Sequence, residues 1–96
     1  NVVVSVLHFI IDLPDIGSLK EKRRVVQSVK AKLQNRFKIS VAEVDLQDSL
    51  RFARLAAAVV SNSRQFGESV LHKALALAEA QAPGRIRDTG IFSEIY

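Results

Sequence analysis

Residues 2–13 read VVVSVLHFIIDL and form one of the two longest apolar runs of the 96-residue chain. The β-branched residues favour a strand, and apolar side chains occupy both of its alternating faces. A strand of this kind needs cover on both sides, which is typical of the centre of a sheet. Pro14, Asp15 and Gly17 then end the pattern. We therefore expect a central β-strand over residues 2–13.

A helix is predicted directly after this strand. Ser18 and Glu21 have the spacing of a capping box, in which the two side chains satisfy the first free N–H groups of a helix. Beyond them the apolar residues recur at helical spacing on one side of the chain, at Leu19, Val26, Val29, Leu33 and Phe37. This spacing predicts an amphipathic helix of about five turns.

A hairpin is predicted after the helix. Residues 39–46 alternate weakly, and residues 52–61 form the second long apolar run, with β-branched residues at its end. The alanines of the second run suit a helix better by propensity, but the length and position of the run favour a strand. We expect two antiparallel strands joined by residues 47–51.

A second helix and a last strand complete the pattern. Capping residues lie between Ser61 and Ser63, and apolar residues then recur at helical spacing up to Pro83. Residues 86–96 are predicted to form the last strand, and Gly90 with the charges around it indicates a position at the edge of the sheet. The predicted order of elements is βαββαβ.

This order predicts an α+β fold, a ferredoxin-like sandwich that spans residues 1–96 as a single domain. Two helices of this length cover one face of a four-stranded antiparallel sheet, with right-handed crossovers. The other face keeps an apolar surface, because the helices cover only one. Exposed apolar surface of this kind usually marks an interface. We expect a homodimer through that face, with an interface that includes Val4, Val6, His8 and Ile10.

The composition excludes several classes of protein. The chain has no cysteine, so it has no disulfide framework and no thiolate metal site. No apolar run reaches the ~20 residues that span a bilayer. We expect a cytoplasmic protein with no membrane span and no cofactor. The sequence starts at Asn1 and contains no methionine, so we expect a few amino-terminal residues to be missing.

Positive charge is concentrated in the first helix. The net charge of the chain is +4, but residues 20–38 have eight basic side chains and a single acid, Glu21, so the other residues together carry −3. Such clusters bind phosphate backbones through counterion release, although a solvated helix face is the alternative. We expect RNA or the ribosome as the partner. The side chains expected to contact phosphates are Lys20, Lys22, Arg23, Arg24, Lys30, Lys32 and Arg36.

The position of each cation around the helix differs. On a helical wheel Lys20 and Arg24 point outward, whereas Lys22 projects toward the core side.

RNA binding to the free sheet face, as in the RRM module, requires aromatic side chains on the central strands. The predicted third strand offers only Phe52, at its start. The basic helix is therefore favoured over the sheet as the surface that contacts RNA.

The sequence contains no arrangement typical of a catalytic site. The two histidines, His8 and His72, have no partner at metal-ligand spacing, and no serine lies in a nucleophile elbow. The only group of carboxylates is Glu43, Asp45 and Asp48, which could hold a divalent cation. Pairing of these carboxylates with Arg51 or Arg54 across the hairpin is the favoured explanation. A metal-dependent enzyme therefore stands as a third hypothesis.

Three blocks of the sequence together resemble a known family. They are SLKEKRRVV at residues 18–26, VAEVD at residues 41–45 and AVVSN at residues 58–62. In this order they resemble the YlxP-like family of small bacterial proteins, and the resemblance covers nearly the whole chain. It implies a ferredoxin-like fold and a bacterial cytoplasmic protein of unknown function, with no catalytic residues to carry over. Members are commonly encoded near translation factors, which implies RNA or a ribosome-associated partner.

Overall fold

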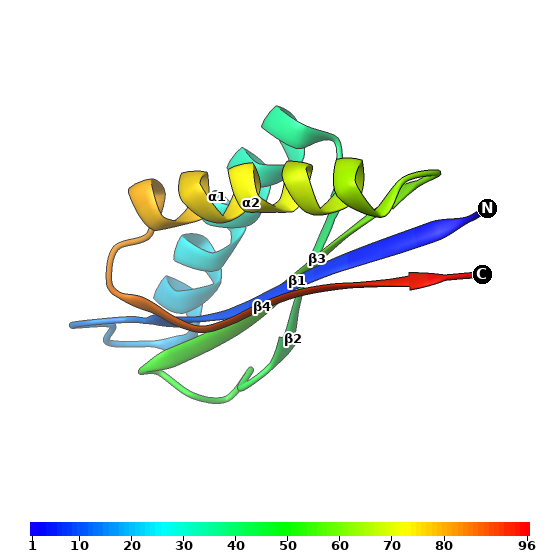
Figure 1. Cartoon of the computed structure of the whole chain (residues 1–96). Helices are drawn as coiled ribbons and strands as arrows, with labels where there is room; N and C mark the ends of the chain where they lie inside the picture. Colours follow the sequence, from blue (N-terminus) through cyan, green and yellow to red (C-terminus); the bar gives the residue numbers. More distant parts are fainter.

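The computed structural model covers residues 1–96 and has the predicted order of elements. The strands and helices are β1 (Val3–Asp12), α1 (Leu19–Phe37), β2 (Ser40–Asp45), β3 (Phe52–Ser61), α2 (Arg64–Gln81) and β4 (Ile86–Ile95). The strands form one antiparallel sheet in the order β2-β3-β1-β4. Both helices lie on the same side of this sheet (Figure 1). The prediction of a ferredoxin-like α+β fold is confirmed.

The ends of α1 follow from local hydrogen bonds. The Ser18 hydroxyl accepts a hydrogen bond from the backbone N–H of Glu21, which is the predicted first half of a capping box. The Glu21 carboxylate accepts from the backbone N–H of Gly17 rather than from that of Ser18. The helix ends at Lys38, whose backbone is left-handed and whose N–H bonds the carbonyl of Gln34. The predicted start of α1 is confirmed.

Small residues explain why the alanine-rich run is a strand. Ala53 and Ala57 of β3 are buried on the face that the helices cover. The facing helix α2 is also built from small residues where it is buried, including Gly67, Ala74 and Ala78. Short side chains on both sides let the helix lie close to the sheet. This tertiary packing outweighs the preference of alanine for a helix.

The core lies between the sheet and the two helices. Leu7, Phe9 and Ile11 of β1 point into it and are fully buried. They are packed with the apolar faces of α1 and α2, in which Leu33 and Leu71 are also buried. The two central strands therefore supply most of the wall against which the helices pack. Neither helix has an apolar stretch long enough to cross a membrane.

The opposite side of the sheet is covered by no element, and we call this surface the open face. Residues of β1 alternate strictly between the core and the open face. The side chains that the sequence predicts on the uncovered face, from Val4 to Ile10, do lie on it. The side chains of the open face in the central part of the sheet are those of Val4, Val6, His8, Ile10, Arg54, Ala56, Ala58 and Phe92. Most of them are half-buried, and Phe92 is exposed.

Candidate functional site

Six of the seven basic side chains predicted to contact phosphates are at the surface of α1. Only two ion pairs occur in the structure, and neither includes any of these six residues. Five of them are exposed and Lys30 is half-buried. We call these six residues the α1 cations, and they are Lys20, Arg23, Arg24, Lys30, Lys32 and Arg36.

The seventh residue, Lys22, is buried and cannot reach a ligand. Its side chain is 2% exposed, and its ammonium group donates to the carbonyls of Leu46 at 2.6 Å and Ser49 at 2.7 Å. A third, longer contact joins it to the carbonyl of Gln47. One carboxylate oxygen of Glu43 lies 3.1 Å from the ammonium nitrogen. The prediction that Lys22 contacts phosphates is wrong, because this side chain holds the β2–β3 turn.

Three of the α1 cations lie along the side of α1 that borders α2. Arg24, Lys32 and Arg36 are separated by multiples of four residues, which places them in one row along a helix. The ammonium group of Lys32 donates to the side-chain oxygen of Gln81 at 3.0 Å, across the gap between the helices. Arg36 lines a hollow of about 370 Å³ together with Lys73 of α2. The positive surface of α1 therefore continues onto α2.

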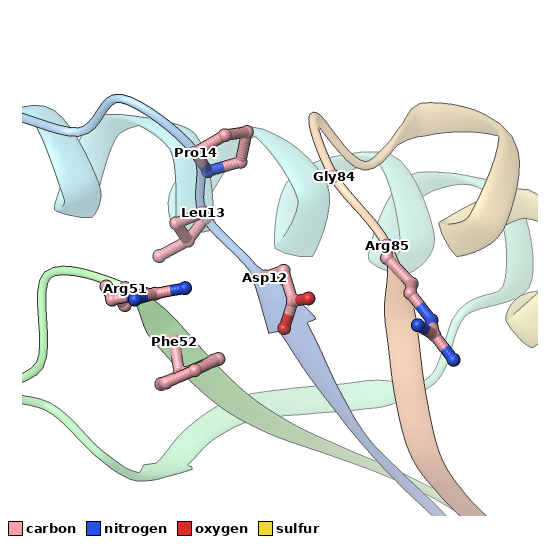
Figure 2. Close-up of a pocket in the computed structure, with 7 residues that line it drawn as sticks. All are labelled: Asp12, Leu13, Pro14, Arg51, Phe52, Gly84 and Arg85. Carbon is pink, nitrogen blue, oxygen red and sulfur yellow. The ribbon is translucent and has the colours of Figure 1, made fainter.

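A pocket of about 290 Å³ lies at the end of the sheet where β1 stops. Figure 2 shows the end of β1, at Asp12 and Leu13, running between Arg51 and Phe52 on one side and Arg85 on the other. We call it the Phe52 pocket, and it is lined by Asp12, Leu13, Pro14, Arg51, Phe52, Gly84 and Arg85.

Arginine side chains surround the aromatic ring of this pocket. The guanidinium carbon of Arg87 lies 4.9 Å from the centre of the Phe52 ring, and that of Arg51 lies 5.5 Å from it. Arg87 is fixed by an ion pair of 3.1 Å with Asp12. The side chains of Arg51 and Arg85 have no ion pair and no hydrogen bond within the protein. Sequence reasoning missed this cluster, although the predicted topology brings the end of β1 and the starts of β3 and β4 together.

The carboxylates of the hairpin form no metal site. Glu43 faces Lys22 on the helix side of the sheet, and not Arg51 or Arg54 as predicted. Asp45 lies opposite Arg54 in the register but makes no ion pair with it, and its carboxylate accepts from the backbone N–H of Leu46. No group of three histidine, aspartate or glutamate side chains is close enough to bind a metal ion. The hypothesis of a metal-dependent enzyme therefore loses its only support.

His8 lies in the middle of the open face. Its Nδ1 atom is 3.0 Å from a guanidinium nitrogen of Arg54, which can only donate, so Nδ1 is the acceptor in this contact. The ring lies against Gly90, where a Cβ atom would collide with the imidazole. The predicted place of His8 on the free face of the sheet is confirmed.

The ionisable groups give no sign of a catalytic centre. The pKa of Tyr96 is raised, first because its hydroxyl donates a hydrogen bond to Glu94, then because of the negative charge on that carboxylate and slight burial. This tyrosine is exposed at the end of β4. His72 is exposed on α2.

Solved structures with a similar fold include an oxygenase and a designed protein. SnoaB from Streptomyces nogalater, a cofactor-independent oxygenase whose structure was determined as a mutant, has a TM-score of 0.53 and 15% sequence identity, over 94% of this chain and 90% of that one. A de novo designed protein with a ferredoxin fold has a TM-score of 0.49 and 18% identity, over 96% of this chain and 82% of that one. At these identities, the likeness to SnoaB shows the fold alone.

The comparison of sequences identifies a relative that shares more residues with this chain than these two structures do. The uncharacterised protein YlxP of Bacillus subtilis (strain 168) is 38% identical over 66 residues, which are 69% of this chain and 72% of that protein. The family model described as "Protein of unknown function (DUF503)" matches residues 4–91. The match spans the buried strand β1, the basic helix α1 and the hairpin, which are the parts that define both the fold and the charged surface. The chain therefore belongs to the DUF503 family, which is described as of unknown function.

Proposed function

We propose that this protein binds the phosphate backbone of RNA through the α1 cations. The observation that carries the proposal is that none of these six residues forms an ion pair in the fold. A cation that forms no ion pair in the fold can neutralise a phosphate and release the counterions bound there.

The arrangement of the α1 cations argues against the alternative of a helix face that is merely solvated. A helix stabilised by its own surface charges alternates acids and bases three or four residues apart. Here Lys20 and Arg24 are four residues apart, as are Lys32 and Arg36, and such like-charge pairs destabilise a helix. The one acid of the segment, Glu21, is used at the start of the helix. The repulsion is relieved when an anion binds.

The salt dependence of RNA binding tests this proposal. If all six α1 cations contact a single strand, the logarithm of the affinity falls with the logarithm of salt concentration with a slope of about −4. Between 50 and 200 mM salt the affinity should then drop about 300-fold. Changing Arg23, Arg24 and Lys30 to Gln should reduce the slope to about −2, because three contacts remain. Fluorescence anisotropy with a labelled single-stranded RNA measures both quantities.

A variant with the same change in net charge serves as the control. Gln65→Glu, Ser69→Glu and Thr89→Glu are all at exposed positions outside α1 and lower the net charge by the same amount. This control variant should keep nearly the slope of the native protein. A flat salt response of the native protein, or equal slopes for the two variants, would contradict the proposal.

The second candidate is a homodimer through the open face, which is favoured by its apolar centre. Four strands about 4.8 Å apart, with up to ten residues at about 3.3 Å each, present a surface of roughly 600 Å². This is of the order of the ~800 Å² that each partner buries in a standard interface. Val6 is at the centre of this surface, between Ala58 of β3 and Phe92 of β4.

Light scattering at micromolar concentration tests the dimer. We expect about twice the 10.6 kDa of one chain. Val6→Glu should return the mass to that of one chain, because two carboxylates would face an apolar surface without partners. Phe66→Glu is the control, since Phe66 is 60% exposed on α2 and not on the sheet. This interface would be ruled out if the native protein had the mass of one chain, or if the Val6→Glu variant kept the mass of two chains.

A further inference from the structure

We propose that the Phe52 pocket binds one unpaired nucleotide of a single-stranded RNA, with the base against the Phe52 ring and the phosphate held by Arg51 and Arg85. The proposal rests on the function proposed above and adds to it the form of RNA that is recognised. Three features carry it, namely two guanidinium groups that form no ion pair and no hydrogen bond, an aromatic wall, and a short loop that leads to the basic surface between the helices.

The free guanidinium groups supply the phosphate contacts. Arg51 precedes β3 and Arg85 precedes β4, so they come from the two strands that flank the end of β1. Both are exposed, and neither side chain has an ion pair or a hydrogen bond within the protein. Arginine presents a planar fork of donors that fits phosphate oxygens in pairs. The two side chains line the pocket from opposite sides of the end of β1, and Arg85 is turned outward (Figure 2), so Arg85 must swing toward β1 to share one phosphate with Arg51.

The aromatic wall supplies the base contact. Phe52 is half-buried and lines the pocket together with the apolar side chains of Leu13 and Pro14. Arg87 lies over the Phe52 ring and is held there by Asp12, whereas Arg51, 5.5 Å from the ring centre, is held by no ion pair or hydrogen bond and can move aside for a base. Bases stack on such rings with little dependence on sequence, since every base has a flat face.

The size of the pocket limits the ligand to one nucleotide. Its volume of about 290 Å³ is at the lower end of the ~300–1,000 Å³ that is typical of small-molecule sites. A base that enters such a pocket must leave its stack and its pairing partner. A loop or an end of single-stranded RNA offers such a base at little cost, whereas a regular duplex does not.

The pocket and the positive surface between the helices are both lined by the loop between α2 and β4. Arg24 of α1 shares a hollow of about 270 Å³ with Pro83, and the next residues, Gly84 and Arg85, line the Phe52 pocket. The loop between α2 and β4 therefore connects the two sites. A strand bound along Arg24, Lys32 and Arg36 can continue over this loop and place a nucleotide in the pocket.

The test compares two variants on three probes. Phe52→Leu keeps an apolar side chain but removes the ring, and it should weaken binding of a labelled short single-stranded RNA about tenfold. The same variant should bind heparin, a polyanion without bases, and duplex RNA as the native protein does. Arg85→Gln changes an exposed side chain with no partner and should weaken binding of the single strand several-fold. Circular dichroism melting of both variants verifies that they are folded.

The outcomes separate this proposal from the one on which it rests. If Phe52→Leu binds the single strand like the native protein while the Arg23, Arg24 and Lys30 variant loses affinity, the pocket is not a nucleotide site and the role of α1 stands. Equal losses for heparin and for RNA would also overturn it, because the pocket would then recognise charge alone. If the native protein binds none of the three probes, the proposed RNA-binding function itself fails.

Discussion

Replacing Lys22 by Met is expected to lower the free energy of unfolding by about 3–5 kcal/mol. The ammonium group of Lys22 donates to the carbonyls of Leu46 and Ser49 and faces Glu43 at 3.1 Å, all in a nearly sealed site. A methionine fills a similar volume but donates no hydrogen bond. The facing oxygen of Glu43 is buried and receives no hydrogen bond, so only the positive charge of Lys22 compensates it. Chemical denaturation monitored by circular dichroism measures the loss.

Two further variants show whether the cause is the unpaired carboxylate. Lys20→Met changes a neighbouring lysine that is exposed and has no partner, so its effect should stay within about 0.5 kcal/mol. Adding Glu43→Leu to Lys22→Met removes the uncompensated charge and should recover part of the lost stability. If Lys22→Met is as stable as Lys20→Met, the buried contacts of Lys22 do not hold the hairpin turn.

The sequence predicted the elements of the fold because each one had a local signal. Ser18 and Glu21 marked the start of α1, and the alternation along residues 2–13 indicated both the strand and its two faces. The alanine-rich strand was harder, because its propensity and its position pointed to different structures. Its assignment depended on the length and position of the run, and the close packing with α2 that makes it a strand is a tertiary effect.

The candidate site could be predicted only in part. The excess of cations in α1 is visible in one segment of the sequence, and the helical wheel even turns Lys22 inward. The partners of Lys22 could not be found in this way, since they are backbone carbonyls of a turn more than twenty residues away. The Phe52 pocket was missed for the same reason. Its arginines stand at the ends of different strands and become neighbours only through the order of the strands in the sheet.

Gly84→Ala is expected to lower the free energy of unfolding by about 2–3 kcal/mol. A Cβ atom at this position would collide with the carbonyl oxygen of Asp12 and would lie 2.9 Å from Cδ of Pro14. The carbonyl is backbone and cannot turn aside as a side chain can. The N–H of Asp12 bonds the carbonyl of Arg85 at 2.8 Å, so moving the end of β1 away would also break its hydrogen bond to the residue that precedes β4.

Gly17→Ala is the matched control for this prediction. The nearest atom to a Cβ at Gly17 is a carboxylate oxygen of Glu21 at 3.6 Å, which is an ordinary contact. The substitution then changes only the conformational entropy of the unfolded chain, which alanine lowers relative to glycine. This should stabilise the protein by about 0.4–1 kcal/mol. The two glycine substitutions should therefore shift the denaturation midpoint in opposite directions. Both lower the entropy of the unfolded chain, but only the Cβ atom at Gly84 collides with the backbone of Asp12. A Gly84→Ala midpoint at or above that of the native protein would mean that the loop between α2 and β4 yields easily, and that the wall it forms behind the Phe52 pocket is not fixed.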